Sequence, residues 1–110
     1  MEADKIKGLL GLCRRAGKIS AGHDAAVASI KGRRARLALI SSDCSGRLKK
    51  EIADECSFDG RGIPIACSGM TMEETAAAIG RKAGVITIDD DNFAERLYDL
   101  TGGNEYDEKI

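Results

Sequence analysis

Three short apolar runs, separated by segments of helical periodicity, constrain the fold of this chain more than any other feature. The runs are LALI at Leu37–Ile40, IPIAC at Ile63–Cys67 and VITI at Val85–Ile88. A continuous apolar run of this length fits a strand that is covered on both faces. Alternation of such strands with helices predicts an α/β fold, in which helices cover both faces of a mostly parallel or mixed sheet.

The segments before and between the runs carry the helical signal. Apolar side chains recur at the spacing of one helical face over about residues 4–16, and Gly17 ends that helix. After an extended piece at residues 18–20, a second helix opens at Gly22 and ends at Gly32.

Three further helices are predicted after the first apolar run. The third helix begins at Ser45 or Gly46. The fourth begins at Thr71, which has capping-box spacing to Glu74. The last begins after Asn92, which has the same spacing to Glu95, and ends before Gly102 and Gly103.

The length and composition fit one domain spanning residues 1–110. Hydrophobic residues make up 43% of the 110 residues, which is enough for one core, and the acidic residues 104–110 are expected to form a frayed tail. The chain has no apolar run of membrane-spanning length, and its beginning lacks the apolar block of a signal peptide. We therefore expect a cytoplasmic protein without a membrane partner.

The cysteines give no sign of a metal site. Four cysteines and one histidine lack zinc-ligand spacing, so neither a metal nor a cofactor is expected. Cys13, Cys56 and Cys67 have apolar neighbours and are expected to be buried reduced thiols, whereas Cys44 lies in a loop and is expected to be exposed.

Charge is distributed unevenly along the sequence. The formal net charge is −1, yet residues 1–50 hold 12 Lys or Arg against 4 Asp or Glu, and residues 51–110 hold 5 against 14. We expect a bipolar molecule whose basic side attracts a polyanion. The alternative is that folding interleaves the two halves and cancels the asymmetry.

Seven cations lie near the ends of the first two helices: Arg14, Arg15, Lys18, Lys31, Arg33, Arg34 and Arg36. Favourable charges at helix C-termini account for two or three of them. We expect a cluster of Arg14, Lys18, Arg33 and Arg34 around Gly22 to contact the phosphates of an RNA, with Arg47 as an addition. Because Gly22 opens the second helix directly after a basic turn, its free backbone N–H groups are expected to form an anion site. Aromatic residues are only 4% of the chain, which favours structured RNA over stacked single strands. No DNA partner is expected.

Catalysis has two weak candidates. The run Asp89–Asp91 ends a strand, where a metal-dependent phosphoryl enzyme would hold its metal, but capping by Asp91 and Asn92 of a helix beginning at Phe93 is the favoured interpretation. His23 has no nucleophile at a suggestive spacing, and the common nucleotide-binding glycine motifs are absent. We predict a protein that is not an enzyme.

Four segments resemble the ribosomal protein L7Ae superfamily of kink-turn RNA-binding proteins, and particularly its small bacterial YlxQ-like members. They are LLGLCRRAGKISAG, LALISSDCS, IGRKAGVITIDD and FAERL, and the similarity extends over about residues 4–101. The resemblance implies a three-layer αβα sandwich around a small mixed sheet of about four strands.

The same resemblance implies an RNA-binding protein of the ribosome or its surroundings, in which three neighbouring loops hold a sharply bent RNA. The loop positions correspond to Gly22, His23 and Asp24, to Ser42 and Asp43, and to Lys82, Ala83, Gly84 and Val85. In the family, the third loop packs apolar groups against a flipped-out base.

The first loop departs from the family pattern. Kink-turn binders carry Asn or Lys and then Glu or Gln where this chain has Asp24 and Ala25, and many members place a basic residue where it has Ala28. An acid repels phosphates, and alanine cannot accept a hydrogen bond from guanine. These departures leave open weaker binding, a different RNA, or an adaptor that docks on a ribosomal protein or translation factor.

Overall fold

The computed structural model describes residues 2–102 and comprises five α-helices, one short 3₁₀ turn and a sheet of four strands. The predicted tail at residues 104–110 lies outside the described residues. In chain order the elements are α1 Glu2–Arg15, β1 Ile19–Ala21, α2 His23–Lys31, β2 Leu37–Ile40, α3 Gly46–Ser57, η1 Phe58–Gly60, β3 Ile65–Cys67, α4 Met72–Ile79, β4 Val85–Ile88 and α5 Asp91–Leu100.

The sheet has the order β1-β4-β2-β3 and is mixed. Strand β4 pairs antiparallel with both β1 and β2, so that Ile88 lies opposite Ile19 on one side and Leu37 on the other. Strand β3 runs parallel to β2. All four residues of β2 and of β4 are buried, as expected for strands covered on both faces.

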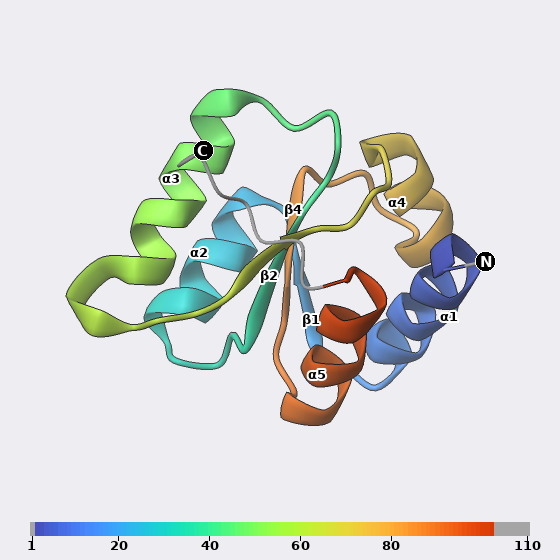
Figure 1. Ribbon diagram of the computed structural model, residues 1–110, viewed down its shortest axis with the longest axis horizontal. Helices are drawn as coiled ribbons and strands as arrows, with labels where there is room; N and C mark the ends of the chain where they lie inside the picture. Colours follow the sequence, from blue (N-terminus) through green and yellow to red (C-terminus); the bar gives the residue numbers. More distant parts are fainter. Residues whose placement is uncertain (1, 103–110) are drawn as a thin grey trace.

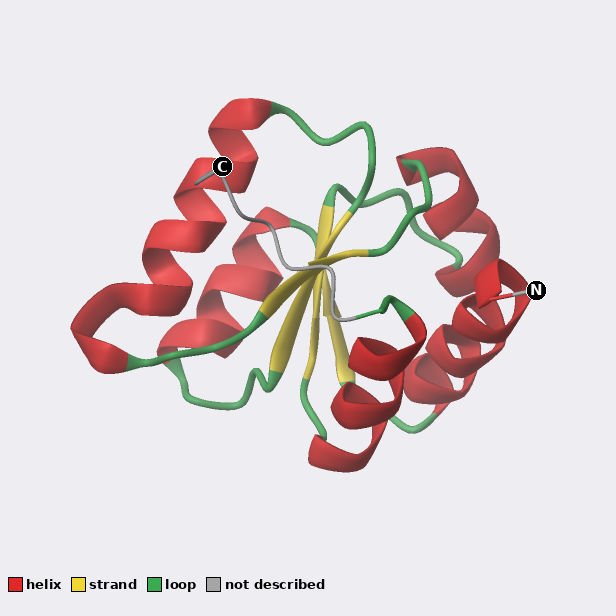
Figure 2. Ribbon diagram, viewed as in Figure 1, coloured by secondary structure: helices red, strands yellow, loops and turns green. Residues whose placement is uncertain are grey.

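Helices cover both faces of the sheet. Helices α2 and α3 lie on one face, and α1, α4 and α5 lie on the other, with the sheet between them (Figures 1 and 2). Each face has its own apolar core: Leu10, Leu97 and their neighbours fill one, and Ile30, Ile52 and their neighbours fill the other. The three-layer αβα sandwich expected from the sequence is confirmed.

The predicted element boundaries hold with two corrections. The capping box of α4 is present, since the Glu74 N–H donates to Thr71 Oγ1 over 3.1 Å and the Thr71 N–H donates to Glu74 Oε1 over 2.9 Å. The cap predicted at Asn92 is wrong, because Asp90 caps α5 by accepting a hydrogen bond from the Phe93 N–H. Strand β3 begins at Ile65 rather than Ile63.

The four cysteines are free thiols, but the predicted burial is wrong for two of them. Cys44 is only 8% exposed, because its loop folds back onto the core beneath α2 and α3. Cys67 is partly exposed on the edge strand β3. Burial raises the pKa of Cys13 and of Cys56 to about 12 and also raises that of Cys44, so these three thiols are poor nucleophiles.

Candidate nucleic-acid interface

Three loops meet where strands β1 and β2 end and strand β4 begins, at the upper end of the sheet in Figure 1. They join β1 to α2 at Gly22, β2 to α3 over residues 41–45, and α4 to β4 over residues 80–84. The strand register explains their meeting, because Val85 at the start of β4 lies opposite Ile40 at the end of β2. We call this group of loops the three-loop edge.

Backbone hydrogen bonds join the loops to one another. The Gly22 N–H donates to the Val85 carbonyl over 2.9 Å, and the Ser41 N–H donates to the Gly84 carbonyl over 3.0 Å. Asp43 accepts a hydrogen bond from the Met72 N–H over 2.9 Å, which ties the second loop to the start of α4. The third loop therefore lies between the other two, and the edge is held as one unit.

Gly84 is required for this close approach. A Cβ added at Gly84 would lie 3.1 Å from Leu48 Cδ2, which is tighter than ordinary contact, and 3.4 Å from Met72 Sδ. Gly22 has φ +94°, a left-handed conformation that favours glycine. Gly84 thus lets the third loop pack closely against α3 and α4, and Gly22 leaves room for the Arg81 guanidinium.

Two expectations for these loops are wrong. The Gly22 N–H is not free for an anion, because it is already bonded to Val85. Ala83 and Val85 are 5% and 1% exposed, since their side chains belong to the two cores, so neither offers an apolar surface to a flipped-out base. The third loop instead exposes the Lys82 side chain, which forms an ion pair with Glu73.

His23 lies between two carboxylates at the start of α2. Its Nδ1 is 2.8 Å from Asp24 Oδ1, and its Nε2 is 2.6 Å from Glu51 Oε2 on α3. These hydrogen bonds, the one to Glu51 foremost, raise the pKa of His23 above its ordinary 6.5. The first loop therefore presents a mixed charge at this helix end, and Asp24 is fully exposed.

The predicted basic residues do not all gather at the three-loop edge. Arg14 lines a hollow beside it, and Arg47 lies in the first turn of α3 directly after the second loop. Lys18 lies at the opposite end of the sheet, since its carbonyl accepts from the Asp89 N–H. Arg33 and Arg34 lie at that end too, shortly before Arg36, whose N–H donates to the Ile88 carbonyl. The prediction of a single cation group around Gly22 is wrong for Lys18, Arg33 and Arg34, because strand β1 separates Gly22 from Lys18 and helix α2 separates it from Arg33 and Arg34.

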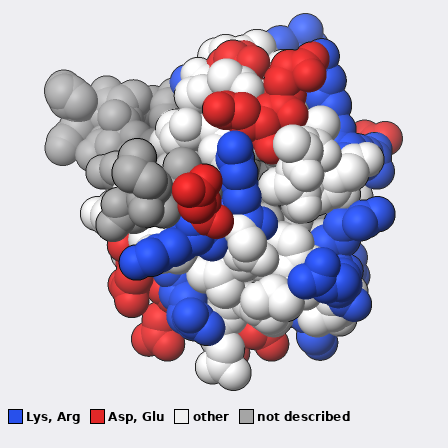
Figure 3. Space-filling model, turned by 90° about the vertical axis from the view of Figure 1, so that its right-hand side faces the viewer, with Lys and Arg blue, Asp and Glu red and all other residues white. Residues whose placement is uncertain are grey.

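The surface charges interleave as a result. On the face that carries α1, α4 and α5, Figure 3 shows Lys and Arg along the right-hand margin and at the lower left, and it shows acidic side chains both at the upper end and along the lower left margin. The expected bipolar molecule is therefore realised only in part, and cations of the two sequence halves share a face with acids.

The comparisons with known proteins agree with this architecture. The family model for the ribosomal protein L7Ae/L30e/S12e/Gadd45 family matches residues 4–98. The chain belongs to this family. Two curated relatives, both named RNA-binding protein YlxQ, are 30% identical over 90% of this chain and 93% of their own length in Enterococcus faecium, and 32% identical over 84% and 90% in Bacillus subtilis.

Solved structures show the same fold. A Bacillus halodurans protein described as of unknown function superposes with a TM-score of 0.80 at 29% identity, over 89% of this chain and 97% of its own. The Giardia lamblia 15.5kD RNA binding protein gives a TM-score of 0.69 at 15% identity, over 94% and 88%, which establishes the shared fold alone.

The acidic run of this L7Ae-family chain has structural partners. Asp89 accepts hydrogen bonds from Ser20 and Ser29 over 2.7 Å each and from Thr87 over 3.0 Å. Asp90 caps α5, and Asp91 forms an ion pair with Arg36 over 3.2 Å. Over residues 2–102 no group of three or more His, Cys, Asp or Glu is arranged to hold a metal ion.

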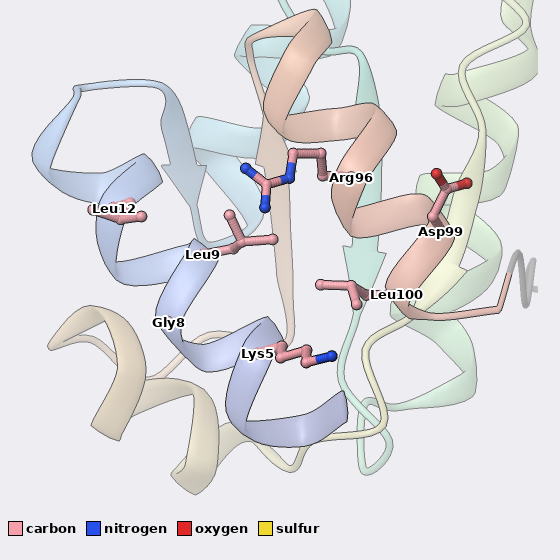
Figure 4. A pocket seen from close by; sticks show the side chains of 7 residues that line it. All are labelled: Lys5, Gly8, Leu9, Leu12, Arg96, Asp99 and Leu100. Carbon is pink, nitrogen blue, oxygen red and sulfur yellow. The ribbon is translucent and has the colours of Figure 1, made fainter. Parts of the chain in front are cut away.

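A second concave surface lies away from the loops, between α1 and α5. This hollow of about 590 Å³ is lined by the apolar side chains of Leu9, Leu12 and Leu100 and by the charged side chains of Lys5, Arg96 and Asp99 (Figure 4). Its lining is largely apolar, and Leu12 remains 48% exposed there. None of the residues predicted for RNA binding lines it.

Arg81 is the site residue that the sequence reasoning missed. It follows Gly80 at the end of α4, and its guanidinium lies against Gly22 of the first loop. The available signal was its place in IGRKAG, between a helix-ending glycine and the third loop.

No helix described in this L7Ae-family chain is both long and apolar enough to cross a bilayer.

Proposed function

We propose that this chain binds structured, kink-turn-like RNA at the three-loop edge, as a cytoplasmic protein associated with the ribosome or its assembly. The observation that carries the proposal is the joining of three loops, distant in sequence, into one rigid edge through the Gly22–Val85 and Ser41–Gly84 hydrogen bonds. A rigid edge recognises a bent RNA by shape, which is how proteins read most folded RNA.

The names of the related proteins support RNA as the binding partner. The family name includes ribosomal proteins, and both curated relatives are named RNA-binding proteins. Each shares about a third of its residues with this chain over most of its length. Neither name describes an enzyme.

The surface around the edge supplies groups suited to a phosphate backbone. Ser42 and Lys82 are exposed on the second and third loops, and Arg14 and Arg47 lie beside the first and second. Hydroxyl and cationic groups of this kind fix the position of an RNA, whereas base-edge contacts confer sequence preference. With Asp24 and Ala25 in the first loop, recognition rests more on RNA shape than on guanine contacts.

The test is a comparison of RNA shapes. A fluorescein-labelled kink-turn RNA should bind more tightly than a straight duplex of the same composition, as measured by fluorescence anisotropy. Ser42→Glu places an acid on the second loop and should weaken kink-turn binding roughly tenfold, by repelling nearby phosphates. Ser57→Glu, at the distant end of α3, is the matched control. Equal affinity of the wild type for the two RNAs would remove the kink-turn assignment.

A protein-binding adaptor is the second candidate, favoured by the acids of the first loop. Asp24 is fully exposed and Glu51 lies beside His23, so a basic protein surface would find carboxylates there. Crosslinking in cells separates the two candidates. Recovery of one defined RNA supports the RNA proposal, whereas recovery of a ribosomal protein or translation factor without RNA supports the adaptor.

A further inference from the structure

A hollow of about 480 Å³ lies beside the edge strand β1, where the ends of α1 and α4 approach the first turn of α2. Its lining brings together two arginines from distant parts of the sequence, Arg14 in the last turn of α1 and Arg81, which follows Gly80 at the end of α4. We propose that Arg14 and Arg81 jointly bind one backbone phosphate of the RNA. This proposal rests on the function proposed above.

Two glycines leave room for the guanidinium groups to lie close to the backbone. A Cβ added at Gly22 would lie 3.1 Å from Arg81 Nη2, and one added at Gly80 would lie 3.5 Å from Arg14 Cζ. Both glycines also have positive φ, of +94° and +76°, which side chains rarely adopt. Because the guanidinium groups rest on the main chain, less of their side-chain freedom remains to be lost when an anion binds.

The charges in this hollow are not balanced by the protein. No Asp or Glu lines it, and among the side chains that the structure describes neither Arg14 nor Arg81 forms an ion pair. Other surface cations do have acids beside them, such as Lys82 with Glu73 over 3.2 Å. Two like charges that share a hollow repel each other, and an anion placed between them removes that repulsion.

The two helix ends beside the hollow also favour a bound anion. Arg14 lies against Gly80 at the carboxyl end of α4, where a cation is favourable. Arg81 lies against Gly22 at the amino end of α2, where a cation is unfavourable and a phosphate is favourable. The planar guanidinium fork also matches the paired oxygens of a phosphate.

The size and position of the hollow favour RNA over free phosphate. Its volume falls within the range of roughly 300–1,000 Å³ typical of small-molecule sites, so a phosphate would fill only part of it and an attached ribose would fit. Ser20, Ala21 and Ala25 contribute only short side chains to the lining. Since the hollow adjoins Gly22, an RNA held by the three-loop edge would continue into it.

The experiment measures binding of a fluorescein-labelled kink-turn RNA over a series of salt concentrations. Arg14→Gln with Arg81→Gln should weaken binding roughly tenfold and make the slope of log affinity against log salt shallower by about one unit, as for the loss of one phosphate contact. Arg33→Gln with Arg34→Gln removes the same charge at the opposite end of the sheet and should leave affinity within about twofold. Circular dichroism checks that both double variants fold.

Phosphate replacement identifies the contact. Each phosphate of the RNA is replaced in turn by a neutral methylphosphonate. At one position the replacement should weaken binding by the wild type but should not further weaken binding by the Arg14→Gln, Arg81→Gln variant. Wild-type affinity and salt slope in that variant would overturn this inference while leaving the proposed function intact. Absence of RNA binding by the wild type would instead overturn both.

A last arm distinguishes the source of the phosphate. Inorganic phosphate alone is titrated while the NMR signals of the Gly22 and Gly80 amides are followed. If the amide chemical shifts saturate only at high phosphate concentration and one methylphosphonate weakens RNA binding, the hollow binds a phosphate of the RNA backbone. Tight saturation by inorganic phosphate without any methylphosphonate effect would assign the hollow to a free anion and overturn the RNA contact.

Discussion

His23 Nε2 lies 2.6 Å from Glu51 Oε2, so the first residue of α2 is held to the middle of α3 beside the three-loop edge. Asp24 contacts the other ring nitrogen, and the single histidine of the chain is therefore flanked by acids on both sides. This arrangement makes the charge of the first loop dependent on pH near neutrality.

The pKa of His23 should be measurably above 6.5, and Glu51→Gln should lower it, because the hydrogen bond to Glu51 is the main cause of the shift. A pKa raised by folding adds stability that is complete below the ordinary value and is lost as the pH rises through the folded-state pKa. NMR titration of the histidine ring in both proteins measures the shift. An unchanged pKa in Glu51→Gln would show that the contact does not persist in solution.

Gly84→Ala should destabilise the protein by about 1–3 kcal/mol, the usual cost of overpacking, because the new methyl group meets Leu48 and Met72. Gly46→Ala is the control, since a Cβ there meets nothing within 4 Å and lies in the first turn of a helix. Urea denaturation of both variants gives the free energies. Equal stability of the two would contradict the close packing of Gly84 against Leu48 and Met72.

Asp89→Ala should cost about 2–4 kcal/mol, since it leaves the fully buried hydroxyls of Ser29 and Thr87 without their carboxylate acceptor. Thermal unfolding of the variant and the wild type measures the loss.

The same measurement with and without Mg²⁺ tests for a metal site. If Mg²⁺ raised the melting temperature of the wild type but not that of Asp90→Asn, a metal-dependent phosphoryl enzyme would again be favoured.

The affinity for kink-turn RNA should fall steeply with salt. If about five phosphates are engaged on duplex-like RNA, the slope of log affinity against log salt should be roughly −4 to −5. Anisotropy titrations over a range of salt concentrations measure it. A flat response would exclude a binding mode based on phosphate contacts.

Cys67 should react fastest with a thiol reagent under native conditions, because it is the only cysteine that is not buried. The pKa of about 12 for Cys13 and Cys56 keeps both as thiols at neutral pH. Mass spectrometry after brief alkylation identifies the modified residue. Preferential labelling of Cys44 instead would mean that its loop opens readily.

Much of the fold was predictable from local patterns. The runs LALI and VITI form fully buried strands, and the spacing of Thr71 and Glu74 marks the start of α4. The start of α5 was misplaced because Asp90 and Asn92 both suit a cap, and spacing alone does not choose between them. The burial of Cys44 depends on how its loop folds over the core, which no local pattern records.

The site was less predictable, because strand register decides which loops meet. Gly22 was singled out correctly as a special turn, but its N–H is bonded to Val85, a residue of the last strand. Arg33 and Arg34 were expected beside Gly22, yet the length of helix α2 separates them from it. Arg81 was overlooked because only tertiary packing brings it to the first loop.

The position of β4 also governs when this chain can fold during synthesis. It is the last strand to leave the ribosome, yet it lies between β1 and β2. Before residues 85–88 emerge, β1 has no neighbouring strand and β2 lacks one of its two. The nascent domain therefore carries unpaired apolar strands until residues 85–88 emerge, and its sheet is completed only then.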